Sequence, residues 1–297
     1  MQCVIDRFRL RTPFWRTNTV FGESLFFIKR GDNPPEAPIL FSPQGLTTVT
    51  SATGLDAFKE GKDYEVDPAA RVIRLLPKSK IPFLEHEELY RAPGSPLSIG
   101  HKTNDSNTYL YFCEGTHFHY RQAAASYAHE AAWDGWTPVC QADRLPRTTA
   151  KLKKKKPLSV LFIGDSITAG ANASKCTGAA PFQPCYAELF PLALADATGA
   201  PVHSLNYAVG GRCSDHGELL ISEIAIQKPD LLVIAYGMND TGYHDAPQYE
   251  RRIRHIIEES RAAAPELEVI LVSSMLGNSE WLGKSHGVFR EYRDVLA

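Results

Sequence analysis

The sequence has no uninterrupted apolar run that approaches the length of about 18 residues needed for a membrane-spanning helix. It also lacks a recognisable secretory signal, because Asp6 and Arg7 stand where such a signal carries its apolar core. These two absences predict no membrane partner. They leave the compartment open: cytoplasmic by default, or exported if a signal was removed.

The chain has little net charge, a formal −2 from 32 basic and 34 acidic residues. A balance this close to zero gives no reason to expect a nucleic-acid partner. The single run of basic residues, Lys153–Lys156, is typical of a solvated linker. A largely disordered chain is excluded because 43% of the residues are apolar. With 297 residues, the chain is long enough for two domains.

The common cofactor motifs are missing as well. None of the six cysteines forms a CxxC pair, so we expect no structural metal site. The sequence has neither GxGxxG nor a P-loop, and we expect no nucleotide or other cofactor. Cys176 and Cys185 flank a loop containing glycine and proline. They can close a disulfide in an exported protein or remain free thiols in a reducing compartment, and both alternatives stay open.

Residues 1–148 have the pattern of a β-domain. Short runs rich in β-branched and aromatic residues recur between turn formers, for example at 24–28, 47–51 and 71–75. No helical apolar stripe of useful length interrupts them. We therefore predict an accessory β-sandwich of the jelly-roll or immunoglobulin kind. Residues 149–157, which contain the lysine run, are predicted to be the linker.

From residue 158 to residue 297 the pattern changes to alternating strands and helices. Strongly apolar strands are predicted at 158–163, 202–209, 231–236 and 269–273, with segments of helical apolar spacing between them. Near-continuous apolar strands indicate a parallel sheet covered on both faces. The predicted fold class is α/β, a doubly wound, flavodoxin-like three-layer α/β/α sandwich.

Residues with possible chemistry follow three of these strands. Gly164-Asp165-Ser166 comes after the first strand, Gly210-Gly211 after the second, and Gly237-Met238-Asn239-Asp240 after the third. The carboxyl ends of parallel strands meet at one edge of the sheet, so the three loops are expected to lie together. A serine nucleophile needs donors aimed at the oxyanion that forms on attack, and glycine N–H groups and a side-chain amide supply them. The pattern predicts acyl transfer through a serine.

These three ordered blocks resemble the SGNH (GDSL-type) hydrolase superfamily of esterases and acetyl-hydrolases. The resemblance implies that Ser166 is the nucleophile and that Gly211 and Asn239 complete the oxyanion hole. Asp165 is expected to hold its loop by local hydrogen bonds rather than to act as an acid. The supporting positions are Asp165, Gly210 and Asp240.

Each of these residues also has a purely structural interpretation. Ser166 can cap the helix that follows it. Gly210 and Gly211 can serve only to form a tight turn, and Asn239 can satisfy local backbone groups as a turn former. The occurrence of all three blocks in order favours the catalytic interpretation.

The family's fourth block, DxxH, is absent from this sequence. In the family its histidine is the base and its aspartate orients that histidine, in a loop after a fifth strand. Our first hypothesis is that the chain is truncated, as a shortened gene, an expressed fragment or a proteolytic product. His244 and His286, which follow the third and fourth strands, are candidate substitute bases, unless they are simply exposed loop residues. An incomplete sheet has an unpaired edge, which predicts a homo-oligomer.

The leading functional hypothesis is a serine esterase that removes a small acyl group, with acetyl expected, from a carbohydrate. Its activity would be impaired if the base is truly absent. The β-domain resembles the N-terminal sandwich of some two-domain carbohydrate acetylesterases. Its aromatic residues Phe118, Tyr120, Trp133 and Trp136 can stack on sugars, although ordinary packing explains them better. The alternative is a non-catalytic protein that binds an acylated glycan through a degenerate site.

Overall fold

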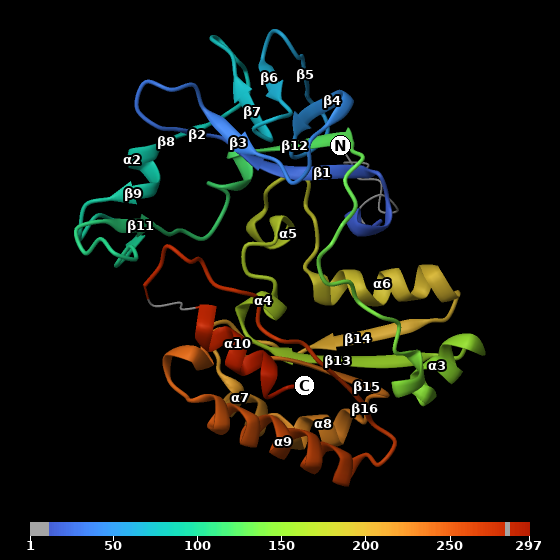
Figure 1. The fold of residues 1–297 in the computed structure, drawn as a ribbon. Coiled ribbons are helices and arrows are strands. Elements are labelled where there is room, and N and C mark those ends of the chain that lie inside the picture. Colours follow the sequence, from blue (N-terminus) through green and yellow to red (C-terminus); the bar gives the residue numbers. More distant parts are fainter. Residues whose placement is uncertain (1–11, 283–285) are drawn as a thin grey trace. The chain divides into compact units, whose positions relative to one another are not determined.

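The computed structural model describes residues 12–282 and 286–297, which form two compact units (Figure 1). The first unit takes its described residues from 12–99, 107–139 and 174–183. The second unit takes its described residues from 100–106, 140–173 and 184–297.

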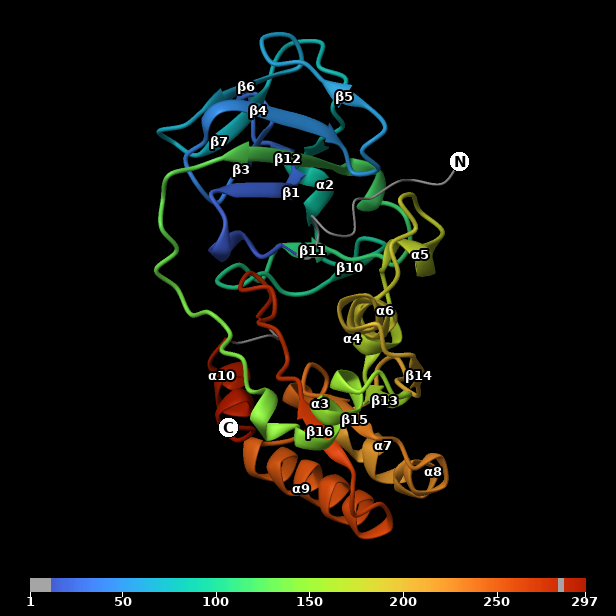
Figure 2. The same cartoon turned by 90° about the vertical axis from the view of Figure 1, so that its right-hand side faces the viewer.

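The first unit is built from antiparallel sheets, whose strands can be followed in Figure 2. One sheet has the order β1 (Thr19–Phe26), β12 (Gln122–Ala128), β4 (Gln44–Ser51) and β5 (Ala57–Phe58). A second has the order β6 (Tyr64–Asp67), β7 (Val72–Leu75), β3 (Glu36–Pro38), β2 (Ile28–Lys29) and β8 (Leu84–Glu85), with only the β2–β8 pair parallel. A small third sheet joins β10 (Ser98–Ile99), β11 (Tyr109–Tyr111) and β9 (Tyr90–Arg91). The short helices are η1 (Phe14–Arg16), α2 (His86–Leu89), η2 (His119–Arg121) and α5 (Ser174–Thr177).

The two larger sheets share one hydrophobic core, as a β-sandwich requires. In β12, buried and half-buried residues alternate strictly, so that Ala123, Ala125 and Tyr127 face the core. They meet Leu25 of β1, and Ile73 of β7 in the other sheet. The predicted β-sandwich is confirmed.

The second unit contains a parallel four-stranded sheet in the order β14–β13–β15–β16. Its strands are β13 (Leu158–Gly164), β14 (Val202–Asn206), β15 (Leu231–Ala235) and β16 (Glu268–Leu271). Its helices are η3 (Ala142–Arg144), α3 (Pro146–Lys153), α4 (Ser166–Ala169), α6 (Tyr186–Thr198), α7 (Ser214–Leu219), α8 (Ile221–Gln227), η4 (Asp240–Gly242), α9 (Ala246–Ala263) and α10 (His286–Asp294). The outer strands of this sheet are β14 and β16. The sequence analysis predicted that a second copy of the chain pairs with the unpaired edge, which is the edge of β16.

Alternate residues of the central strands pack into different cores on the two faces of this sheet. Leu161 and Ile163 of β13 join Tyr249, Ile253 and the other apolar residues of α9 on one face. Val160 and Phe162 join the core that includes residues of α3 and α6 on the other face. Figure 1 shows α6 on one side of the sheet and α8 and α9 on the other. The predicted three-layer α/β/α architecture is confirmed.

Strand β14 is shorter than the sequence predicted, since it ends at Asn206 and not at residue 209. The Asn206 side chain ends the strand by bonding outside the sheet. Its Oδ1 accepts the Ala208 N–H at 3.1 Å, and its Nδ2 donates to the Thr168 carbonyl at 2.7 Å. This asparagine therefore turns the chain and ties it to helix α4.

The predicted linker, residues 149–157, contains most of helix α3 and belongs to the second unit. The helix is held at both ends by acidic residues distant in sequence. At its start, the carboxylate of Glu268 accepts the N–H groups of Arg147 at 2.8 Å and Thr148 at 2.7 Å. Near its end, Lys151 is paired with Asp230. Neither partner could be inferred from the composition of this segment.

Two other properties bear on the sequence expectations. Cys113, Cys140, Cys176, Cys185 and Cys213 are free thiols, so the disulfide alternative for Cys176 and Cys185 is not adopted. Among the helices of the described ranges, none is both long and apolar enough to cross a membrane.

Candidate active site

The first loop presents Ser166 at the end of β13, as the sequence predicted. Asp165 is the N-cap of α4, and its side chain accepts the Ile167 N–H at 3.0 Å. The capping role that Ser166 could have filled therefore belongs to Asp165, and Ser166 is the first residue of the helix. No histidine in the described ranges is hydrogen-bonded to the Ser166 hydroxyl.

The second loop passes directly beside this serine. The N–H of Val209 donates to the Gly164 carbonyl at 3.1 Å, which holds the loop against the end of β13. A Cβ atom at Gly210 would lie 3.8 Å from Cβ of Ser166. Gly211 has a φ of +75°, a conformation that favours glycine. Within the described part of the chain, the Gly211 N–H has no acceptor, so it is available to a ligand.

The third loop is joined to the second through Asn239. Its Nδ2 donates to the carbonyl of Arg212, next to Gly211, at 3.0 Å. This bond uses one of the two N–H groups of the amide and leaves the other for a ligand. Because Arg212 is distant in sequence, the Asn239 amide does not merely satisfy its own turn.

Asp240 lies beneath these loops and is fully buried. Its Oδ1 accepts both the N–H of Ser214 at 2.9 Å and the Ser214 hydroxyl at 2.5 Å, so it holds the start of α7. Burial raises the pKa of neighbouring Asp165, and the charge of Asp240 raises it further, although backbone N–H groups of Ile167 and Met238 oppose the shift. The two aspartates thus hold the ends of these loops by hydrogen bonding, and their carboxylates repel one another.

The candidate bases have different surroundings. His244 follows η4, and its Nε2 lies 2.6 Å from Nη1 of Arg252. A guanidinium can only donate, so in this contact Nε2 is the acceptor and its lone pair is engaged. His286 begins α10, and its side chain lies outside the described part of the structure.

A pocket of about 330 Å³ opens at the carboxyl ends of β13, β15 and β16. Its walls are mainly apolar and aromatic, and they include Asp165 and Ile167, the residues on either side of Ser166 in the sequence, but not Ser166 itself. The lining residues are Asp165, Ile167, Thr168, Tyr186, Ala235, Tyr236 and residues 272–275. The sequence analysis missed Tyr186 and residues 272–275, because they belong to no motif and reach the site only through the packing of α6 and the chain that leaves β16.

The aromatic residues of the first unit divide into packed and exposed members. Trp133 packs against Phe14, with ring centroids 5.1 Å apart, and Phe118 packs against Phe26 at 5.6 Å. Tyr120 and Trp136 are 62% and 82% exposed. Packing therefore accounts for two of the four residues that were considered for sugar stacking.

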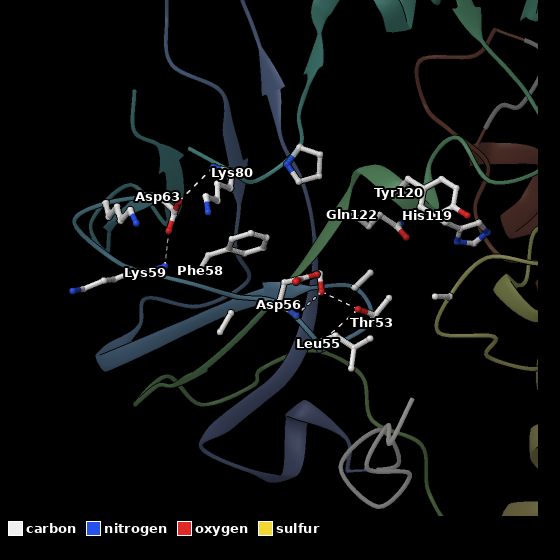
Figure 3. A pocket seen from close by; sticks show the side chains of 16 residues that line it. Thr53, Leu55, Asp56, Phe58, Lys59, Asp63, Lys80, His119, Tyr120 and Gln122 are labelled. Carbon is white, nitrogen blue, oxygen red and sulfur yellow. Dashed lines mark hydrogen bonds between the residues drawn. The ribbon is translucent and has the colours of Figure 1, made fainter. Parts of the chain in front are cut away.

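Exposed Tyr120 lines a second pocket, of about 690 Å³, within the first unit (Figure 3). Phe58, His119 and Gln122 line the same pocket, so rings and hydrogen-bonding groups face a common space. Asp63 also lines it, and its carboxylate accepts the Lys59 N–H at 2.9 Å. A pocket with this mixture of groups can take a polar ring-shaped ligand.

Residues 162–297 match the family model described as the GDSL-like Lipase/Acylhydrolase family. The matched range begins within β13 and includes all three predicted blocks. No curated protein sequence matches the chain.

Several solved structures are similar to part of the chain. The crystal structure of TesA is 23% identical, with a TM-score of 0.37, over 46% of this chain and 69% of that one. A mutant of Axe2, an acetyl-xylooligosaccharide esterase from Geobacillus Stearmophilus, is 22% identical, with a TM-score of 0.37, over 47% and 69%. A two-domain esterase (CEX) active on acetylated mannans is 17% identical, with a TM-score of 0.39, over 51% and 38%.

Proposed function

We propose that this chain is a serine esterase with Ser166 as its nucleophile, because residues 162–297 match the model of the GDSL-like lipase/acylhydrolase family. The proposal assigns the oxyanion hole to the N–H of Gly211 and the amide of Asn239. It gives Asp165, Gly210 and Asp240 supporting roles.

The observation that carries this proposal is the meeting of the first two loops at Ser166. Gly210 lies so close that an added Cβ would be 3.8 Å from Cβ of the serine. The free N–H of Gly211 follows in the chain, and Asn239 is bonded to the next residue, Arg212. We therefore assign donors from two different loops to the same serine, as stabilisation of an oxyanion requires.

In the proposed reaction, the Ser166 hydroxyl attacks the carbonyl carbon of the ester and its proton passes to a general base. The carbonyl oxygen becomes an oxyanion that accepts hydrogen bonds from Gly211 and Asn239. Collapse of this intermediate expels the alcohol and leaves an acyl group on Ser166. Water then attacks the acyl-enzyme by the same route and releases the carboxylic acid.

Two histidines are candidates for the general base that accepts the proton of Ser166. His244 can accept the proton only if Arg252 releases its Nε2. His286, at the start of α10, is the other candidate. Replacing each with glutamine separates them, because loss of the true base lowers the rate by several orders of magnitude while loss of the other leaves it unchanged.

The proposed substrate is a small acyl ester, with acetyl expected, on a carbohydrate. The pocket of about 330 Å³ that is lined by Asp165 and Ile167, the sequence neighbours of Ser166, has room for a short acyl chain. The pocket of the first unit, with exposed Tyr120 at its wall, suits a sugar ring that stacks on an aromatic face.

The test is hydrolysis of p-nitrophenyl acetate by the full chain and two serine variants. Ser166→Ala should lower the rate roughly 10³-fold or more. Ser222→Ala, which changes an exposed serine on α8, should leave it unchanged. Equal rates in the wild type and Ser166→Ala would overturn the nucleophile assignment. Faster hydrolysis of the octanoyl than of the acetyl ester would overturn the small-acyl assignment.

The contact between Arg252 and His244 favours a second candidate, a protein that binds an acylated glycan without hydrolysing it. A serine without a base should react poorly with a fluorophosphonate. Binding of acetylated mannan or xylan without covalent labelling of Ser166 would support this candidate. Rapid labelling that disappears in Ser166→Ala would exclude it.

A further inference from the structure

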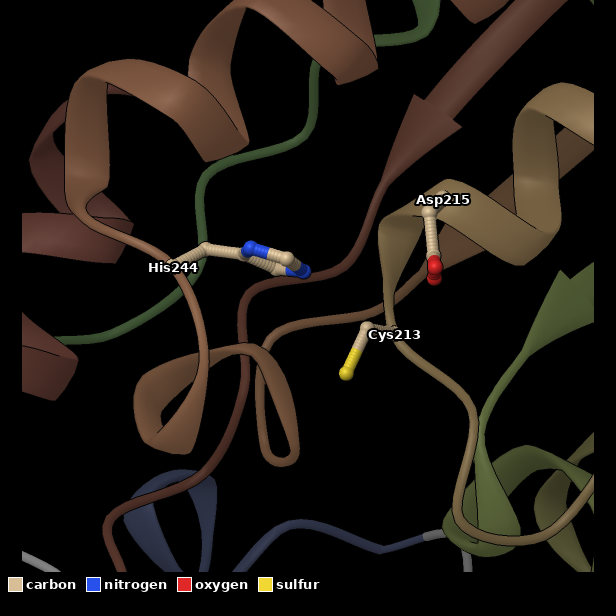
Figure 4. Close-up of side chains that lie close together, drawn as sticks. All are labelled: Cys213, Asp215 and His244. Carbon is tan, nitrogen blue, oxygen red and sulfur yellow. The ribbon is translucent and has the colours of Figure 1, made fainter.

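Three side chains of different chemistry meet near the candidate active site (Figure 4). Cys213 directly precedes α7, Asp215 lies in the first turn of α7, and His244 follows η4. One potential ligand atom from each lies within 4.8 Å of the other two. We propose that these three residues form a binding site for a divalent transition-metal ion of the zinc class.

The backbone that carries these groups is held by Asp240 and Tyr292. Asp240 accepts the N–H and hydroxyl of Ser214, which stands between the two ligands on α7. The carbonyl of Asp240 accepts the His244 N–H at 2.8 Å, and Tyr292 donates to the His244 carbonyl at 2.7 Å. The three candidate ligands are therefore held together before an ion binds, which lowers the entropic cost of binding.

The donor set selects the kind of metal. A thiolate, an imidazole and a carboxylate are all zinc ligands, whereas calcium and magnesium prefer oxygen donors throughout. Zinc–ligand bonds are about 2.0–2.3 Å long, and side-chain rotation can supply any movement needed to reach them from separations within 4.8 Å. Cys213 is only 8% exposed and Asp215 is exposed, so the ion would sit between the interior and the solvent. Three protein ligands leave a position for water.

The guanidinium of Arg252 should weaken the binding of a metal ion at this site. Its Nη1 lies 2.6 Å from Nε2 of His244, so the guanidinium competes for that lone pair and repels a cation. Its Nε lies 3.7 Å from the Glu218 carboxylate, which gives the guanidinium another partner when an ion binds. Removing the guanidinium should therefore strengthen metal binding.

Metal binding would also act on the loops of the candidate active site. Cys213 follows Arg212, whose carbonyl accepts the Asn239 amide. An ion shared by Cys213 and His244 would thus join the loop of Gly211 to the loop of Asn239. An imidazole bound to an ion cannot accept a proton at the same nitrogen, so metal binding at His244 would leave His286 as the candidate base. The proposal itself does not depend on hydrolysis, since ion binding is measured without a substrate.

The experiment is titration of the chelator-treated full chain with cobalt(II), whose thiolate charge-transfer and ligand-field bands report the coordination. We expect one ion per chain, with bands typical of tetrahedral coordination. Cys213→Ser should abolish the charge-transfer band, while Cys176→Ser, which changes an exposed cysteine, should keep it. Asp215→Asn and His244→Gln should weaken binding by about tenfold or more.

Two further variants make the outcome decisive. Ser166→Ala should bind cobalt as the wild type does, so failure of the esterase proposal and failure of the metal proposal are distinguishable. Arg252→Gln should bind it more tightly, an effect that a merely destabilised loop would not produce. Absence of the thiolate band, its persistence in Cys213→Ser, or weaker binding in Arg252→Gln would overturn the proposal.

Discussion

The carboxylate of Asp240 accepts both hydrogen-bond donors of Ser214, its N–H at 2.9 Å and its hydroxyl at 2.5 Å. This pair connects the loop after β15 to the first turn of α7. The loop carries Asn239, and the turn follows Gly211 and Arg212. The geometry of both proposed oxyanion donors therefore depends on a contact between two buried side chains that lie beside them.

Replacing Asp240 with alanine should destabilise the protein. The substitution leaves the Ser214 N–H and hydroxyl buried without an acceptor, at a cost of about 1–3 kcal/mol for each unsatisfied group. Urea unfolding followed by circular dichroism measures the change. If the contact is responsible, Ser214→Ala should cost less in the Asp240→Ala background than alone. Fully additive effects would show that the two residues are not coupled.

Asn239→Ala should slow ester hydrolysis without unfolding the protein. Removal of one oxyanion donor costs about 10²–10³ in kcat. Asn239→Asp should be equally slow, because a carboxylate keeps the shape of the amide but has no N–H to donate. The measurement is kcat for p-nitrophenyl acetate. A rate close to that of the wild type in either variant would remove Asn239 from the oxyanion hole.

Gly164→Ala should be strongly destabilising because β13 ends in a space too small for a methyl group. The added Cβ would lie 2.5 Å from Oγ1 of Thr168 and 2.6 Å from the backbone carbonyl oxygen of Ala235. Overpacking of this kind costs about 1–3 kcal/mol or more. Gly242→Ala is the matched control, since no atom lies within 4 Å of its added Cβ. Similar unfolding midpoints for the two variants would contradict the steric argument.

The pair formed by Lys151 and Asp230 should make stability depend on pH at the acid end. Burial tends to raise the pKa of Asp230, but Lys151 and the N–H and hydroxyl of Ser159 outweigh it and hold the pKa below its usual value. A lowered pKa in the folded state stabilises the fold above the unfolded-state pKa of about 4. That contribution is lost as the pH falls through the folded-state pKa.

Lys151→Met tests this dependence. The difference in free energy of unfolding between the variant and the wild type should be largest near neutral pH and should shrink as carboxylates are protonated. Lys153→Met, which changes an exposed lysine on the same helix, should show no such trend. Urea unfolding at a series of pH values measures both. A difference for Lys151→Met that is independent of pH would rule out the ion pair as its cause.

Sequence patterns were most informative where the physical requirement is local. A strand buried on both faces must be apolar along its length, so β13 and β15 could be predicted from continuous runs of apolar residues in the sequence. Because parallel strands end at one edge, the positions of Ser166, Gly211 and Asn239 followed from those strands. The patterns were least informative where a partner is distant in sequence, as for α3, whose first turn is held by Glu268.

By itself, the sequence determined the two classes of fold, the order of the three blocks and the serine that they present. Only the tertiary structure decided that Asp165 caps α4, that the Asn239 amide spans two loops, and that Arg252 engages His244. It alone brought Cys213, Asp215 and His244 together, since no short spacing joins the histidine to the other two. The physical reason is the same in each case. The periodicity of apolar residues shows which face of a helix or strand is turned toward the core. Hydrogen bonds and metal-ligand sets depend instead on which loops the packed sheet brings together.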